Sequence, residues 1–273
     1  MAKREVPEIN AGSMADIAFL LLIFFLVTTT MDKDTAYLRK IPKKVEKKTE
    51  TIVEKKNVYK IVINSNQLIQ ARDSTIGADN IESLNGRIKH FYLVNRGKKS
   101  DRALNYPYYS FGTELIYKGN IRDLETRQRN LRRKLKVTEN GKKVEKFTKM
   151  LDQTTNGIQK WRVKLRMIKL YTKYSGEIEL PEIASQAHIR LESFEATDYS
   201  AYVAVQSEIQ RAVTEMRNEE SKKLFDVSYT AMKKYYQQKK LEKDDPKVKL
   251  YKKHMDLIKV LFPLTIIEVD PKR

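Results

Sequence analysis

The chain has 273 residues, and its 54 Lys and Arg against 35 Asp and Glu give a formal net charge of +19. It has no cysteine, which excludes disulfide bonds and thiol chemistry, and its three histidines lie far apart, so neither a metal site nor another cofactor is expected. The positive charge predicts acidic partners, such as phospholipid headgroups or a polyanionic envelope polymer. Because basic residues occur along the whole chain, specific nucleic-acid binding is not expected.

The first recognisable element is an apolar run over residues 14–31. As a helix it would be about 27 Å long, which matches a hydrocarbon core of roughly 30 Å with little tilt to spare. The rest of the chain is polar and has no second run of this length. The pattern therefore predicts a single transmembrane helix followed by one large soluble part.

One carboxyl, Asp16, lies inside this apolar run. An Asp in the middle of a membrane helix costs about 2.5 to 3.5 kcal/mol, so such a residue is a candidate functional group. Its place near the start of the run allows a second interpretation, in which Ser13 is a helix N-cap and Asp16 lies in the first turn. The residues alone leave both interpretations open.

The apolar run is interpreted as an uncleaved anchor, because a cleaved secretory signal would need a small-residue cleavage site after its apolar core and a basic leader without Glu5 and Glu8. Residues 32–56 are rich in lysine, which predicts an extended linker. Two rules disagree on orientation. The basic residues after the run favour a cytoplasmic C-terminal side by the positive-inside rule, whereas long domains can be exported despite their charge.

A β-branched run over residues 57–64 and a second run over residues 67–71, separated by a polar turn, predict a β-hairpin. A short helix is predicted to pack behind this hairpin. Its signal is a set of four apolar residues at helical spacing, Ile81, Leu84, Ile88 and Phe91.

The segment 97–186 is strongly basic. Residues 106–112 predict a loop or hairpin, and a basic helix follows, whose apolar face consists of Ile121, Leu124, Leu131 and Leu135. The same helix carries five cations, Arg127, Arg129, Arg132, Arg133 and Lys134. We expect its apolar face to pack on the domain or on a partner, and its cations to meet anionic headgroups or an acidic partner. The alternative is that the cations form only a solvated face.

Further along the basic segment, a second helix is predicted around Val144, Phe147 and Leu151. Residues 161–167 alternate strictly between apolar and basic residues, and this alternation favours a strand. The spacing of Ile158 and its apolar successors also fits a helix.

The C-terminal third has clearer signals. Residues 187–194 alternate as a strand, and Asp198 is placed to cap a helix whose apolar stripe contains Tyr202, Ile209, Val213 and Met216. A second helix is predicted to begin at Asp245 and Pro246 and to stop before Pro263, and residues 264–269 predict a final strand.

Residues 6–32, which begin Val-Pro-Glu-Ile-Asn-Ala-Gly-Ser-Met-Ala-Asp, closely resemble the membrane segment of the ExbD/TolR biopolymer-transport family, in the form found in Bacteroidetes-type bacteria. Other stretches are similar to the periplasmic domain of the same family: residues 57–71, 199–219, 221–225 and 258–272. The resemblance implies a cytoplasmic N-terminus and a periplasmic large domain. It also implies a homodimer of this chain held inside a pentameric ExbB-like channel subunit, which drives a TonB-like protein. Asp16 matches the intramembrane Asp that carries the proton in that family.

The chain departs from the family pattern in two places. A Leu-Pro element usually follows the membrane span, and here it is replaced by Ile41 and Pro42. The basic region 97–186 resembles no part of the short family members, so its role cannot be carried over.

The expected fold is therefore α+β, with one N-terminal transmembrane helix, a periplasmic domain in which helices cover a small mixed sheet, and a helical basic insertion. The expected division of the chain is a cytoplasmic segment 1–13, a transmembrane helix 14–31, a basic linker 32–56, a periplasmic domain made of 57–96 and 187–273, and a basic insertion 97–186.

The expected function is that of a non-enzymatic, inner-membrane subunit of an energy-transducing complex that is driven by the proton motive force. In this interpretation Asp16 alternates between its neutral and ionised forms, because removal from water disfavours the charge. Thr28, Thr29 and Thr30 could line the proton path, or could only bond their own helix carbonyls. The alternative function is a membrane-anchored envelope scaffold that binds anionic cell-wall or lipid polymers and has no proton role.

Overall fold

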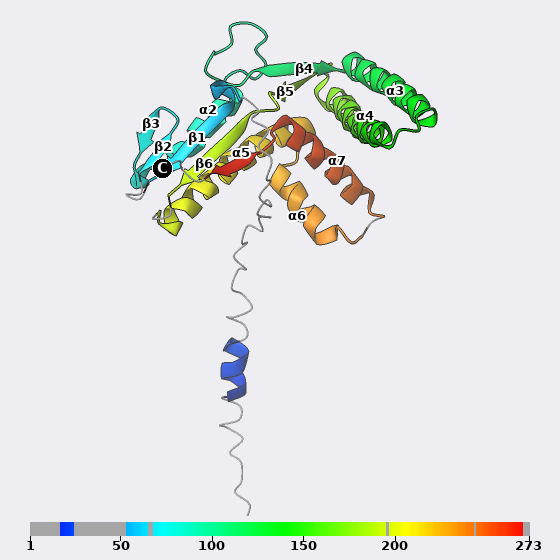
Figure 1. The fold of residues 1–273 in the computed structure, drawn as a ribbon. Helices are drawn as coiled ribbons and strands as arrows, with labels where there is room; N and C mark the ends of the chain where they lie inside the picture. Colours follow the sequence, from blue (N-terminus) through cyan, green and yellow to red (C-terminus); the bar gives the residue numbers. More distant parts are fainter. Residues whose placement is uncertain (1–16, 25–52, 65–67, 195–196, 243, 270–273) are drawn as a thin grey trace, which may run out of the picture. The chain divides into compact units, whose positions relative to one another are not determined.

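The structure is a computed structural model, and it describes residues 17–24, 53–64, 68–194, 197–242 and 244–269 (Figure 1). The chain divides into two compact units, Met1–Thr51 and Ile52–Arg273. In the first unit, residues 17–24 form an α-helix. The elements of the second unit are, in chain order, η1 (Lys55–Asn57), β1 (Val58–Ile63), β2 (Ile69–Ala71), β3 (Ser74–Ile76), η2 (Ala78–Asn80), α2 (Ser83–Leu93), β4 (Tyr109–Thr113), α3 (Glu114–Lys136), α4 (Gly141–Ser175), β5 (Glu179–Ile183), β6 (His188–Ser193), α5 (Tyr199–Phe225), α6 (Tyr229–Lys239), α7 (Pro246–Leu261) and β7 (Ile266–Val269).

A five-stranded mixed sheet organises the second unit, and its strand order is β3–β2–β1–β6–β7. Strands β1, β2 and β3 form an antiparallel meander, whereas β6 pairs in parallel with both β1 and β7. In β1 the side chains of Tyr59, Ile61 and Ile63 are buried, and Lys60 between them is exposed. This period of two gives the sheet one apolar face.

Helices α2 and α5 pack against each other and share one core with the apolar face of the sheet. The Phe91 ring of α2 lies 5.2 Å from the Tyr59 ring of β1, measured between centroids. Helix α5 contributes a buried stripe at helical spacing, which contains Val205, Ile209 and Val213. The described residues therefore form the α+β unit with a mixed sheet and covering helices that the sequence predicts.

A separate two-stranded ribbon, formed by β4 and β5, carries helices α3 and α4 (Figure 1). Tyr109 lies opposite Ile183 at one end of the ribbon, and Thr113 lies opposite Glu179 at the other. The Tyr109 hydroxyl donates a hydrogen bond of 2.7 Å to the Tyr92 carbonyl of α2, and burial raises the pKa of this tyrosine to about 12. The ribbon is thus attached to the core beside α2.

Helices α3 and α4 form an antiparallel hairpin, here called the arm (residues 114–175). At 1.5 Å per residue α3 is about 34 Å long and α4 about 52 Å long. The Thr113 hydroxyl caps α3 by accepting a hydrogen bond of 3.3 Å from the Ile116 amide. Beyond the ribbon α3 packs chiefly against α4, and Gln128 donates a hydrogen bond of 2.8 Å to the Thr155 hydroxyl across this contact.

The base of the arm is held to the core by three rings from three helices, of which His254 is buried and the other two are partly buried. Tyr174 of α4 lies 4.9 Å from the Phe225 ring of α5, and His254 of α7 stacks on Phe225 at 3.8 Å. The Tyr174 hydroxyl also lies 3.2 Å from the His254 Nε2 atom. Among the described residues, the Nδ1 atom of His254 has no hydrogen-bond partner.

One prediction from the sequence is wrong. Residues 161–167, which the alternating pattern assigned to a strand, lie inside the continuous helix α4. The residues that decide the conformation are Ile158, Trp161, Leu165 and Ile168, because they recur every three or four positions and bury one side of the helix. Trp161 packs on Tyr117 of α3, with 5.5 Å between ring centroids. Val163, which alternation would bury, is exposed.

Most other predicted elements are confirmed, including the hairpin of β1 and β2, helix α2, and the strands β6 and β7. The Asp198 side chain accepts a hydrogen bond from the Ser200 amide and caps α5, and Asp245 caps α7 just before Pro246. Helix α6 and strands β3 and β5 were not predicted. Strand β3 has only three residues, and α6 buries only Tyr229 and Met232, so neither carries a strong apolar period.

Gly112 should be intolerant of a side chain. A Cβ atom at this position would overlap the ring and hydroxyl of Tyr117, which is buried. We expect Gly112→Ala to lower the free energy of unfolding by about 1 to 3 kcal/mol, because a buried ring must move. Gly119→Ala is the matched control, since nothing lies near its added Cβ, and Ala in a helix should raise stability by up to about 1 kcal/mol. Urea unfolding followed by circular dichroism measures both, and equal effects would contradict the prediction.

His254 should make stability depend on pH. Burial, followed by the charge of Lys173, lowers the pKa of His254 below its usual value of 6.5. The unfolded chain therefore takes up a proton at a higher pH than the folded one, so the free energy of unfolding falls as the pH drops below about 6.5 and is unaffected by this group above it. We expect His254→Phe to reduce this fall between about pH 7 and pH 5. The control is His90→Phe, at an exposed position, and an unchanged pH dependence in the His254 variant would contradict the prediction.

Candidate functional site

The sequence-predicted proton site lies outside the described residues, since they do not include Asp16, Thr28, Thr29 or Thr30. The described residues 17–24, which follow Asp16 in the sequence, are helical. All of their large apolar side chains, from Ile17 to Phe24, are between 39 and 63% exposed. A helix that is apolar on every side needs lipid or a protein partner to cover it. Among the described residues, no helix combines the length and the apolar character needed to span a membrane.

The predicted basic cluster lies on the outer half of α3. Arg127, Arg129, Arg132 and Arg133 are all exposed. At 100° per residue, Arg129, Arg132 and Arg133 lie within about 100° of one another on one side of α3, whereas Arg127 lies on the opposite side from Arg129. Arg129 donates a hydrogen bond of 3.0 Å to the Thr126 hydroxyl. The arrangement offers an approaching anionic surface several cations from more than one direction.

The apolar face of this helix is occupied by α4. Leu131 is buried, and Ile121, Leu124 and Leu135 are half-buried along the same side of α3. The expected apolar docking surface is thus the neighbouring helix of the same arm. The cations are left on the solvent side of the hairpin.

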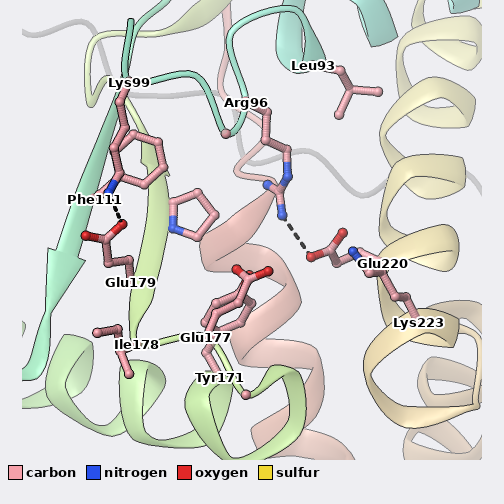
Figure 2. A pocket seen from close by; sticks show the side chains of 13 residues that line it. Leu93, Arg96, Lys99, Phe111, Tyr171, Glu177, Ile178, Glu179, Glu220 and Lys223 are labelled. Carbon is pink, nitrogen blue, oxygen red and sulfur yellow. Dashed lines mark hydrogen bonds and ion pairs between the residues drawn. The ribbon is translucent and has the colours of Figure 1, made fainter.

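A pocket of about 680 Å³ lies where the base of the arm meets the core, and Figure 2 shows its lining. It is enclosed by the end of α2 and the loop after it, by β4, by the turn from α4 into β5, and by α5. Two ion pairs cross it. The Arg96 guanidinium lies 2.8 Å from the Glu220 carboxylate, and the Lys99 ammonium lies 2.6 Å from Glu179.

The charges that line this pocket are balanced. Arg96 and Glu220 are each only 14% exposed, and Arg96 also lies over the Phe262 ring at 4.4 Å. The Tyr171 hydroxyl donates a hydrogen bond of 2.7 Å to Glu177, and burial raises the pKa of this tyrosine. Because each carboxylate faces a cation or a hydroxyl, the pocket favours neither an anion nor a cation. Its ion pairs join the loop after α2 to α5 and to β5.

The sequence contained no signal for this pocket. Arg96 and Glu220 lie 124 positions apart, and each occurs in a helical or loop context where a charged residue is ordinary. Within the described part of the chain, no group of three or more His, Cys, Asp or Glu side chains is arranged to hold a metal ion.

The chain was compared with known proteins. A family model described as "Biopolymer transport protein ExbD/TolR" matches residues 2–104. Neither a curated protein nor a solved structure matches the chain. The matched residues include the apolar run with Asp16, the meander of β1 to β3 and helix α2, and the match ends just before β4. Over residues 2–104, this chain is therefore similar to the ExbD/TolR biopolymer-transport family.

Proposed function

We propose that this chain is the ExbD-like subunit of an energy-transducing complex of the ExbB–ExbD–TonB type, which uses the proton motive force to power transport across the outer membrane. The observation that carries the proposal is the family match, because it includes the apolar run 14–31 and its single carboxyl, Asp16. The proposal assigns the chain a mechanical role and no enzymatic activity.

In this proposal residues 14–31 span the inner membrane once, with residues 1–13 in the cytoplasm and the unit Ile52–Arg273 in the periplasm. The exposed apolar side chains of residues 17–24 support a membrane or channel environment, since in water each would leave a large apolar surface unburied. Two copies of the chain would lie inside a pentameric ExbB-like channel subunit and act on a TonB-like protein.

Asp16 would be the proton-carrying group. A proton that crosses the membrane releases about 2.3 kcal/mol per 100 mV, which is enough to bias a helix between two positions inside a ring of channel subunits. Thr28, Thr29 and Thr30 would supply hydroxyl groups toward the periplasmic end of the path. The remaining strands of the sheet, β6 and β7, and helix α5 would complete the ExbD-like domain, although they lie beyond the matched residues.

A second candidate function, a membrane-anchored scaffold that binds anionic envelope polymers, is favoured by the ten cations between residues 127 and 149. In that case Asp16 serves only as part of a helix start. The two functions differ in whether Asp16 must titrate.

Asp16→Asn separates the two functions, because it keeps the size and much of the capping ability of the side chain while removing its charge. We expect the variant to insert and assemble normally but to abolish proton flux into liposomes that contain the channel subunit, and to abolish energised uptake in cells. Asp16→Glu should keep part of both activities. Asp34→Asn, a carboxyl just beyond the apolar run, is the matched control and should be active. Normal uptake by the Asp16→Asn variant would refute the proton role.

Topology provides an independent test. A reporter that is active only in the periplasm should work when it is fused after Arg273 and should fail when it is fused before Ala2, because the proposal exports the C-terminal unit. The opposite pattern would mean that the lysine-rich residues after the apolar run have set the orientation, and the proposed function would then be wrong.

A further inference from the structure

The arm carries most of the net charge of the chain. Residues 114–175 contain 18 of the 54 Lys and Arg but only six of the 35 Asp and Glu, which gives this segment +12 of the total of +19. The charge is densest at the outer end of the arm, defined here as residues 127–149. That segment has ten Lys and Arg against two Glu.

The cations of the outer end form no ion pairs within the described part of the chain. All ten are exposed. The arm's ion pairs instead involve Lys118, Arg162, Lys164 and Lys169, which lie nearer the ribbon. Uncompensated charges of one sign repel one another, so an anionic partner at the outer end would relieve this repulsion.

The apolar residues of the outer end limit what that partner can be. Leu131, Leu135, Val144 and Phe147 are buried or half-buried between the two helices, so no continuous apolar face remains to insert into a bilayer or to cover a protein groove. Phe147 is the segment's one aromatic residue. Stacking of nucleic-acid bases, which needs exposed aromatic rings, is therefore not favoured. A broad surface that carries many separate negative charges fits the arrangement best.

The N-terminal segment places one such surface within reach. This step rests on the proposed function, in which residues 14–31 span a membrane. The 21 residues from 32 to 52 can extend over at most about 70 to 75 Å, which exceeds the roughly 52 Å length of α4. Residues 32–52 are therefore long enough to let the arm contact the bilayer. They also keep the local concentration of headgroups high, so that individually weak charge contacts can produce binding.

We propose that the outer end of the arm binds anionic lipid headgroups of the membrane that residues 14–31 span, and so holds the unit Ile52–Arg273 against that surface. The binding is electrostatic and peripheral. The Lys and Arg side chains contact the lipid phosphates, and the apolar residues between α3 and α4 stay packed against each other.

The test uses the full chain in lipid nanodiscs. Because the chain has no cysteine, Val137→Cys gives one labelling site at the outer end of the arm, where Val137 is 82% exposed. A fluorophore at position 137 is quenched by nitroxide groups on lipid headgroups only when it lies close to the bilayer surface. We expect strong quenching in discs of phosphatidylcholine with phosphatidylglycerol, little in discs of phosphatidylcholine alone, and a loss of quenching as salt rises from about 0.05 to about 0.5 M.

Charge variants make the test specific. Arg129, Arg132 and Arg133 form no ion pair with described residues, so replacing all three by Glu should reduce quenching in anionic discs to the level of neutral discs. Replacing the same three by Gln tests the loss of charge without placing acidic groups near the end of α3. The matched control replaces Lys233, Lys234 and Lys240 by Glu at α6, which changes the net charge equally and should leave quenching intact.

Four outcomes would overturn the proposal. Equal quenching in neutral and anionic discs would exclude headgroup charge as the ligand, and an equal loss in the α6 control would show that only overall charge matters. A chain that remains in the discs at high salt but shows no quenching in anionic lipid at low salt would refute the arm's role alone. A chain that leaves the discs would refute the proposed membrane span as well, so the two failures are distinguishable.

Discussion

The parallel pairing of β1 with β6 is the contact on which the rest of the second unit depends. It aligns Val58 with His188 and Ile63 with Ser193, and so joins two segments that are separated in the chain by the whole arm. Such a pairing is entropically costly when the connecting loop is long and free. The ribbon of β4 and β5 reduces that cost, because Tyr109 and Ile183 are held opposite each other where the chain leaves and rejoins the core.

The ribbon also explains how a long helical arm and a small sheet can coexist. The two helices of the arm pack against each other around Leu131 and are joined by the hydrogen bond from Gln128 to Thr155. The core of the second unit is separate and contains Ile61, Ile189 and the buried stripe of α5. The base of the arm joins the core through the rings of Tyr174, Phe225 and His254. Changes near the outer end should therefore affect the core little, whereas changes at the base should affect both.

The pairing of charged residues differs between the base of the arm and its outer end. At the base, cations are paired with carboxylates across the pocket, where partial burial makes unpaired charges costly. At the outer end, where water screens each group, ten cations are unpaired with described residues. The family match ends just before the arm begins, so the charged hairpin is a feature of this chain beyond the matched segment. A proton-driven subunit and a surface-binding arm are compatible roles, because they use different residues.

The sequence by itself determined the elements whose signals are local. The alternation in β1 and β6, the caps at Asp198 and Asp245 and the lone carboxyl in residues 14–31 were all readable, because each depends on neighbours a few positions away. Only the tertiary structure decided that residues 161–167 are helical. Their alternation also fits a strand, and the packing of Trp161 on Tyr117 of α3 favours the helix. The tertiary structure alone shows that Arg96 pairs with Glu220 and that the apolar face of α3 packs against α4. Contacts between residues far apart in the chain produce no periodic pattern in the sequence.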